Sequence, residues 1–188
     1  GIIKRNFKHM EPNTLLNLYK TMVRSHLDYA VCVWTPHNKQ LIDNIERVQR
    51  RATKLLNKNR DKNYKERLKY LKLPTLAYRR VRGDMIEVYK ILNGVYYSTV
   101  SPYLSLSENL HTRGNVMKLN TTRAKYDIRK YFFSIRIVSI WNSLPNKVIE
   151  SKSVDEFKTS LDDHWRHEEI KYDYHAKLTG TGVRGLDI

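Results

Sequence analysis

Residues 39–57 read KQLIDNIERVQRRATKLLN, and this stretch decides how the fold is interpreted. Its apolar side chains are Leu41, Ile45, Val48, Ala52 and Leu55. They recur at spacings of four, three, four and three residues, which is the repeat of one face of an α-helix. The arginines and lysines fall off this stripe, so we expect an apolar face toward a core and a basic face toward solvent.

Positive charge is concentrated on and after this helix. Residues 47–82 hold 14 Lys or Arg and two acids, and so carry +12 of the chain's net +16. Acids that would pair with these bases one helical turn away are nearly missing, and uncompensated charge repels itself unless a polyanion binds. A second basic segment, residues 113–147, has eight bases and one acid. This concentration predicts contact with phosphates, which position a nucleic acid but do not read its sequence.

Helices are predicted on both sides of this stretch. Pro36 and Pro74 end helices, Gly94 is a natural C-terminal stop, and Ser153 with Glu156 three residues later forms a capping box. The predicted helices are Asn13–Trp34, Lys39–Asn57, Tyr64–Leu73, residues 75–93, residues 128–141 and a last amphipathic helix after Ser153 with the stripe Val154, Phe157, Leu161 and Trp165.

The chain changes character after Gly94. Residues 95–127 hold many Ser, Thr and Asn, which indicates loops with a short strand such as Val116–Leu119. The sequence therefore predicts a mainly α fold, one helical domain with a small irregular or β element near residues 100–125.

Three regions follow along the chain. Residues 1–94 form a basic helical region, and residues 95–165 add a buried segment and the capped helix. After Arg166 the apolar periodicity is lost and glycines recur, so residues 166–188 are expected to form a mobile tail.

Cellular context is limited by what the sequence does not contain. No run approaches the roughly 18 apolar residues that a membrane span requires. The lone Cys32 excludes an internal disulfide and a cysteine-based zinc cluster. Without a signal peptide or a disulfide, the expected location is the nucleus or the cytoplasm.

The candidate nucleic-acid contacts are the bases of the two basic segments. Arg50 and Arg51 lie off the apolar stripe and are expected to face solvent. Tyr126 and Tyr131 are the best candidates for stacking on bases, because Arg and Lys flank them. The full set of expected phosphate contacts is Arg47, Arg50, Arg51, Lys54, Lys58, Arg79, Arg80, Arg123, Lys125, Arg129 and Lys130.

The sequence contains no recognisable catalytic motif. Asp162 and Asp163 resemble a paired-aspartate metal site, but they lie in a predicted helix, where adjacent residues point about 100° apart. The chain has no glycine-rich phosphate loop and no Gly-x-Ser-x-Gly motif. We therefore expect no activity from this chain alone, no metal and no cofactor.

Several segments, in order, resemble the C-terminal part of the reverse transcriptase of non-LTR retrotransposons, the jockey-like LINE elements. The match covers roughly residues 1–165. The segments are Leu18-Tyr19-Lys20, His26-Leu27-Asp28-Tyr29-Ala30 with Trp34, Val48-Gln49-Arg50-Arg51-Ala52-Thr53-Lys54-Leu55, Glu66-Arg67-Leu68, Leu73-Pro74-Thr75-Leu76, Arg79-Arg80, Arg82-Gly83-Asp84-Met85-Ile86-Glu87-Val88-Tyr89-Lys90, Thr112-Arg113-Gly114, Phe132-Phe133-Ser134, Trp141-Asn142-Ser143-Leu144-Pro145, and Val154, Phe157, Lys158 and Leu161-Asp162 to Trp165.

The resemblance implies that this chain is the thumb and post-thumb region of an RNA-directed DNA polymerase. The fingers and the palm, with the catalytic aspartates, would precede Gly1 and be its partners in the same polypeptide. Thumbs of reverse transcriptases hold the template–primer duplex by its backbone, a role that would be carried here by Arg47, Arg50, Arg51 and Lys54. RNA and DNA would then be the ligands.

Two other functions stay open. The chain could be a domesticated or degenerate remnant that acts as a helical protein–protein interaction module, with its basic face toward an acidic partner. A metal nuclease that uses Asp162, Asp163 and His164 is the third alternative, and the helical placement of these residues disfavours it.

Overall fold

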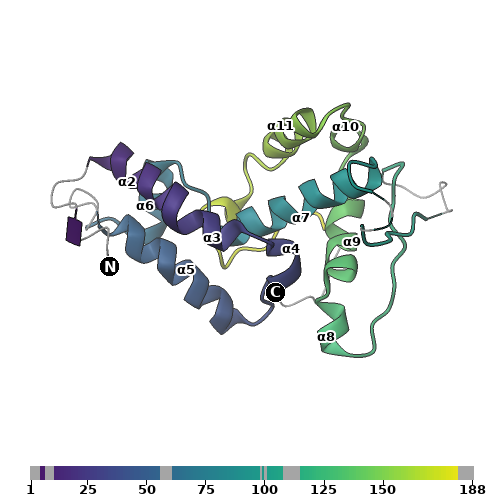
Figure 1. The fold of residues 1–188 in the computed structure, drawn as a ribbon, viewed down its shortest axis with the longest axis horizontal. Coiled ribbons are helices and arrows are strands. Elements are labelled where there is room, and N and C mark those ends of the chain that lie inside the picture. The colour runs from purple at the N-terminus through teal and green to yellow at the C-terminus, as the bar shows by residue number, and fades with distance from the viewer. Residues whose placement is uncertain are drawn as a thin grey trace. The chain divides into compact units, whose positions relative to one another are not determined.

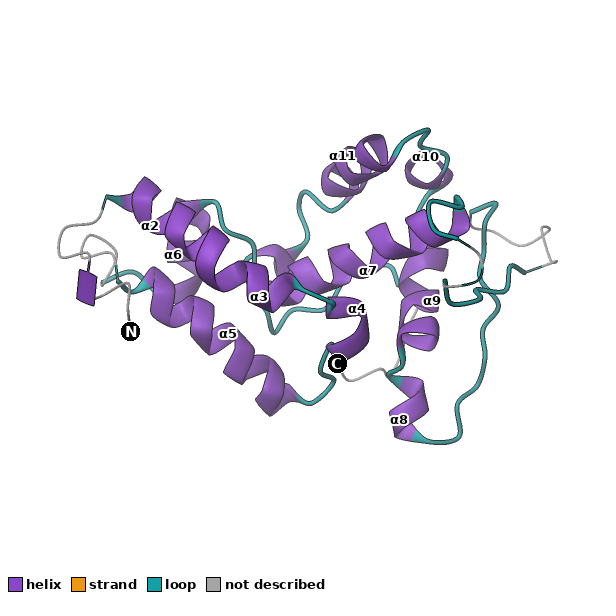
Figure 2. Ribbon diagram, in the orientation of Figure 1, coloured by secondary structure: helices purple, strands orange, loops and turns teal. Residues whose placement is uncertain are grey.

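The computed structural model describes residues 5–6, 11–55, 61–97, 99, 101–107 and 115–181 (Figure 1). Among these residues the regular secondary structure is helical, which confirms the mainly α fold class (Figure 2). In chain order the elements are α2 (Pro12–Leu18), the π-helix η1 (Tyr19–Arg24), α3 (Ser25–Asp28), α4 (Val31–Trp34), α5 (Lys39–Thr53), α6 (Tyr64–Leu71), α7 (Leu76–Leu92), α8 (Asp127–Lys130), α9 (Phe133–Ser143), α10 (Asn146–Ile149), α11 (Val154–His164) and the 3-10 helix η3 (Glu169–Lys171).

The chain divides into two compact units. Unit 1 is Gly1–Arg80 with Glu169–Lys177, and unit 2 is Val81–Glu168 with Leu178–Ile188. The boundary falls inside α7, whereas the sequence suggested a change of region at residue 94.

The first predicted helix is broken into shorter elements. Within it, the hydroxyls of Thr21 and Ser25 donate to carbonyls four residues back, at 2.8 and 2.6 Å, in and just after the widened π-helical turn. Ala30 then has a φ of +49°, in the left-handed region, and separates α3 from α4. Periodicity carries no signal of this local geometry, so the sequence suggested one continuous helix.

The buried face of α5 differs from the expected stripe. Its buried side chains are Ile42, Glu46, Gln49 and Thr53. Leu41 is 52% exposed and Val48 is 37% exposed, so the expected apolar face is wrong for these two. Polar side chains occupy the inner face because partners in unit 1 satisfy their hydrogen bonds, which makes their burial tolerable.

The end of α7 confirms the stop predicted at Gly94. Gly94 has a φ of +66°, its N–H donates to the Ile91 carbonyl at 3.2 Å, and the Val95 N–H donates to the Lys90 carbonyl at 3.0 Å. This pair of bonds is the Schellman motif, which favours glycine at the left-handed position.

The core of unit 2 contains a cluster of aromatic side chains. The rings of Tyr89 and Phe157 stack with centroids 4.4 Å apart, and Trp141 lies 6.1 Å from Phe157. Phe157 and Leu161 of α11 are buried, as the predicted stripe required. The Ser153 hydroxyl accepts from the Glu156 N–H at 3.1 Å, which confirms Ser153 as the N-cap. The predicted capping box is formed only in part, because the Glu156 carboxylate accepts from the Lys152 N–H and not from the Ser153 N–H.

Residues 115–119 are held against the end of α9. Asn142 accepts from the Leu119 N–H at 2.8 Å and donates to the Leu119 carbonyl at 2.9 Å. The indole N–H of Trp141 donates to the Met117 carbonyl at 2.8 Å. The expected strand Val116–Leu119 is not formed: the described part of this region contributes an isolated bridge between Leu106 and Leu119.

The segment after Arg166 is ordered further than expected. In unit 1, Ile170 is buried, and its carbonyl accepts from the Thr75 hydroxyl at 2.6 Å. The Lys171 carbonyl accepts from the Thr75 N–H at 2.9 Å. Residues 169–177 therefore pack into unit 1 instead of forming a free tail, while residues 182–188 lie outside the described part of the chain.

Candidate nucleic-acid interface

Ion pairs between distant residues neutralise part of the +12 segment. Arg79 makes a two-bond fork with Asp28, at 3.2 and 2.6 Å, within unit 1. Arg82 makes a second fork with Asp162, at 2.6 and 2.7 Å, within unit 2. These carboxylates lie 51 and 80 residues from their partners, so a search for acids one helical turn away could not find them. The expectation of uncompensated charge is therefore wrong for these two arginines.

Arg80 is also unsuited to phosphate contact. Its side chain is buried, at 5% exposure, and its charge acts on Glu46. A guanidinium in that position cannot reach a nucleic acid without opening the core of unit 1. We therefore remove Arg80 from the candidate interface, together with Arg79.

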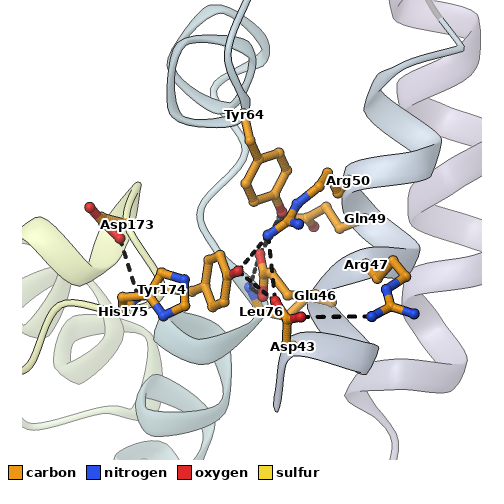
Figure 3. Close-up of polar contacts among 10 residues, drawn as sticks. All are labelled: Asp43, Glu46, Arg47, Gln49, Arg50, Tyr64, Leu76, Asp173, Tyr174 and His175. Carbon is orange, nitrogen blue, oxygen red and sulfur yellow. Dashed lines mark hydrogen bonds and ion pairs between the residues drawn. The ribbon is translucent and has the colours of Figure 1, made fainter. Parts of the chain in front are cut away.

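Arg50 takes part in a polar cluster within unit 1 (Figure 3). Its guanidinium donates to the hydroxyl of Tyr174, which in turn donates to Asp43 at 2.6 Å. It lies 5.2 Å from the ring centre of Tyr64 and 5.4 Å from that of Tyr174. The Tyr174 hydrogen bond, with Arg50 and Arg47 nearby, lowers the pKa of Asp43. Arg50 therefore joins Tyr174 to α5, and its side chain is only 33% exposed, so the expectation that it faces solvent is wrong for most of its surface.

Glu46 is the buried carboxylate beside this cluster. Burial raises its pKa, opposed by the hydrogen bond from Tyr64, by Arg80 and by the Leu76 N–H. Leu76 N lies 3.0 Å from the carboxylate at the start of α7 (Figure 3). All of these partners are protein groups of the fold, so Glu46 has a structural role at the N-terminus of α7.

Gln49 completes the buried network. It accepts from the Tyr19 hydroxyl at 2.6 Å and donates to the Pro74 carbonyl at 3.0 Å and the Tyr64 hydroxyl at 3.2 Å. The VQRRATKL segment of the resemblance thus contains a residue whose visible role is to connect α5 with η1 and α6.

The remaining bases of α5 are available to a ligand. Arg51 and Lys54 are exposed and have no ion pair among the described residues. Arg47 is half exposed, with a loose contact of 3.8 Å to Asp43. These three residues form the exposed basic face of α5. Lys58, which was expected to extend this face, lies outside the described residues.

A second group of bases lies in unit 2, along residues 123–132, which we call the basic–aromatic segment. Arg123, Lys125 and Arg129 are exposed and Lys130 is half-buried. Within the described part of the chain, none of the four has an ion-pair partner.

Aromatic rings interrupt these bases at the surface. Tyr126 is 66% exposed and Phe132 is 65% exposed. Tyr126 occupies the N-cap position of α8 and Phe132 that of α9, and neither side chain makes a capping hydrogen bond. Tyr131 is half-buried and lies 5.5 Å from the Lys130 ammonium, which makes it a weaker stacking candidate than Tyr126.

Two further exposed side chains were missed, Tyr103 near this segment and Ile128 within it. Tyr103 is 88% exposed and Ile128 is 84% exposed. Nothing in its sequence context separates Tyr103 from the other twelve tyrosines, of which three are buried and four are also exposed. Its proximity to Arg129, which lines the same pocket, appears only in three dimensions.

No group of three or more His, Cys, Asp or Glu side chains in the described residues is arranged to hold a metal ion. Asp162 is held by Arg82, and Asp163 pairs with Arg166 at 2.5 Å. No described helix combines the length and hydropathy needed to cross a bilayer.

Comparison with known proteins gave no match among family models, curated proteins or solved structures.

Proposed function

We propose that this chain is a non-catalytic, nucleic-acid-binding part of a retrotransposon reverse transcriptase, and that it holds template RNA and primer DNA through phosphate contacts. One observation supports this proposal above the others. In the basic–aromatic segment, four bases lack carboxylate partners among the described residues while two exposed rings lie between or beside them. Phosphates neutralise such arginines and lysines, and the nucleobases of an unpaired strand stack on such rings.

The exposed basic face of α5 supplies a second set of contacts. Arg47, Arg51 and Lys54 would engage the sugar–phosphate backbone without reading sequence. With Arg50, Arg79 and Arg80 committed to the fold, seven of the eleven expected contacts remain among the described residues, and Lys58 lies outside them. They are Arg47, Arg51, Lys54, Arg123, Lys125, Arg129 and Lys130.

The proposal is tested by the dependence of binding on salt. Each phosphate contact contributes about −0.9 to the slope of log K against log salt for a duplex and about −0.7 for a single strand. With about five contacts we expect a slope of about −3.5 to −4.5 for RNA, DNA and hybrid ligands. Absence of binding at low salt, or a slope near zero, would contradict the proposal. The chain alone should extend no primer.

A second function is favoured by the exposed side of α5. Leu41 and Val48, 52% and 37% exposed, lie on the helix that also carries Arg47 and Arg51. An acidic amphipathic helix of a protein partner would cover such a surface. Replacing Leu41 and Val48 with Ser would then weaken that partner's binding, and would leave nucleic-acid affinity unchanged.

A further inference from the structure

Beside the basic–aromatic segment, unit 2 contains a pocket of about 170 Å³. Three apolar side chains contribute to its lining, Leu119 and Val138, which are buried, and Ile135, which is half-buried. Pockets for drug-sized ligands hold roughly 300–1,000 Å³, so this one suits a single small ring system and not a whole cofactor.

The rim of the pocket is polar and has unused hydrogen-bonding groups. The hydroxyls of Ser105, Thr122 and Ser134 make no hydrogen bond within the described part of the chain. Asn120 donates through its Nδ2 to the Leu106 carbonyl at 3.1 Å, which leaves its Oδ1 as an acceptor. Donors and acceptors beside apolar side chains are an arrangement that recognises the edge of a heteroaromatic ring.

The walls are held in place by backbone bonds. The Asn120 N–H donates to the Ser105 carbonyl at 2.9 Å, across the bridge between Leu106 and Leu119. Asn142 fixes Leu119 to α9, whose first turns supply Ser134, Ile135 and Val138. The pocket is therefore built by three segments that are bonded to one another.

Arg129 joins the pocket to the charged surface, because it lines the pocket and belongs to the basic–aromatic segment. Tyr103, 88% exposed, lies at the same rim. A ligand with a planar ring in the pocket and a phosphate near Arg129 would contact both the pocket and the charged surface.

We infer that this pocket binds one unstacked nucleobase of a single-stranded RNA or DNA segment, with Arg129 on an adjoining phosphate. The inference rests on the proposed function and narrows its ligand, because a base in a duplex is stacked and paired and cannot enter a pocket of this size. Duplex nucleic acid would bind only through the exposed arginines and lysines of the surface.

The test fills the pocket without altering charge. Ser134→Met places a longer side chain at the rim, and helical position favours Met over Ser. Ser139→Met is the matched control, since Ser139 is half-buried on the same helix and does not line the pocket. Thr122→Met is a second filling variant, on an exposed loop, in case the first one disturbs α9.

The ligands are single strands of about ten nucleotides, within the range of known single-strand sites, intact or with abasic positions, and a duplex of equal length. The wild type and Ser139→Met should bind the intact strand about tenfold more tightly than the abasic one, equivalent to about 1.4 kcal/mol. Ser134→Met and Thr122→Met should lose most of this preference and keep the wild-type affinity for the duplex.

Three results would overturn the inference. One is a wild type that binds abasic and intact strands equally, and another is a preference that both filling variants keep. Failure of every ligand to bind at low salt would instead contradict the proposed function, and the inference with it.

Discussion

The carboxylate of Glu46 accepts hydrogen bonds from the backbone N–H of Leu76, at 3.0 and 3.3 Å, thirty residues further along the chain. The first amides of a helix have no partner within the helix. A carboxylate at that end accepts their hydrogen bonds and interacts favourably with the positive end of the helix dipole. One side chain of α5 thereby fixes the beginning of α7, and Tyr64 donates a third hydrogen bond to it.

Replacement of Glu46 tests this role. Glu46→Gln puts an amide donor where the carboxylate accepts from Tyr64 and Leu76, and we expect a loss of about 1–3 kcal/mol in the free energy of unfolding. Circular dichroism during urea denaturation measures it. Glu150→Gln, on an exposed residue, is the control and should change stability by less than about 0.5 kcal/mol.

The stability difference between Glu46→Gln and the wild type should depend on pH. Because burial raises the pKa of Glu46, the folded state holds the proton more tightly than the unfolded state. The stability from this group is fully present below the ordinary value of 4.5 and is lost as pH rises through the folded-state pKa. The deficit of Glu46→Gln relative to wild type should therefore narrow as pH rises from 4.5 toward neutrality. A deficit that does not vary with pH would contradict the raised pKa.

Arg50 and Arg51 are neighbours with opposite predicted effects. Arg50→Ala removes the hydrogen bond to Tyr174 and two ring contacts, so we expect a loss of about 1–3 kcal/mol in stability. Arg51→Ala removes an exposed side chain and should cost less than about 0.5 kcal/mol. When nucleic-acid affinity is measured on folded protein, Arg51→Ala should lower it more than Arg50→Ala does. Equal stability of the two variants would show that the Tyr174 cluster contributes nothing.

Asn142 should be essential for the order of residues 115–119. Asn142→Ala leaves the N–H and the carbonyl of Leu119 without these partners, and we expect a loss of about 1–3 kcal/mol. Hydrogen exchange should show faster exchange of the Leu119 amide. Asn120→Ala, which removes a more exposed side-chain bond to Leu106, should have a smaller effect and serves as the control. Unchanged exchange at Leu119 would contradict this anchoring role.

Much of the helical organisation was predictable, because its signals are local. The start of α5 at Lys39, the end of α7 before Gly94 and the Ser153 cap of α11 depend on neighbouring residues. The face of α5 was not predictable from apolar spacing. Glu46 and Gln49 are buried only because Tyr19, Tyr64 and the start of α7 supply their partners, and such partners have no fixed sequence distance.

The candidate site was predictable as a concentration of charge and not as a list of residues. Arg79 and Arg82 look like their unpaired neighbours until the fold brings Asp28 and Asp162 to them. Tyr126, by contrast, was chosen from local composition as a stacking candidate, and its ring is exposed as that role requires. The order of residues 169–177 was missed because short segments pack through single side chains such as Ile170 and show no periodicity.

The central claim, that the basic–aromatic segment binds nucleic-acid phosphates, is tested most directly by matched charge reversals. Arg123→Glu with Arg129→Glu changes the net charge as much as Lys147→Glu with Lys152→Glu, whose exposed lysines lie in unit 2 outside the segment.

The measurement is the salt dependence of binding to a single strand, with folding checked by circular dichroism. We predict that the first pair lowers affinity at low salt at least tenfold and makes the slope shallower by about 1.4, as expected for two lost phosphate contacts. The control pair should leave the slope unchanged. Equal losses in both pairs would show that net charge alone attracts the nucleic acid, and would contradict an interface at this segment.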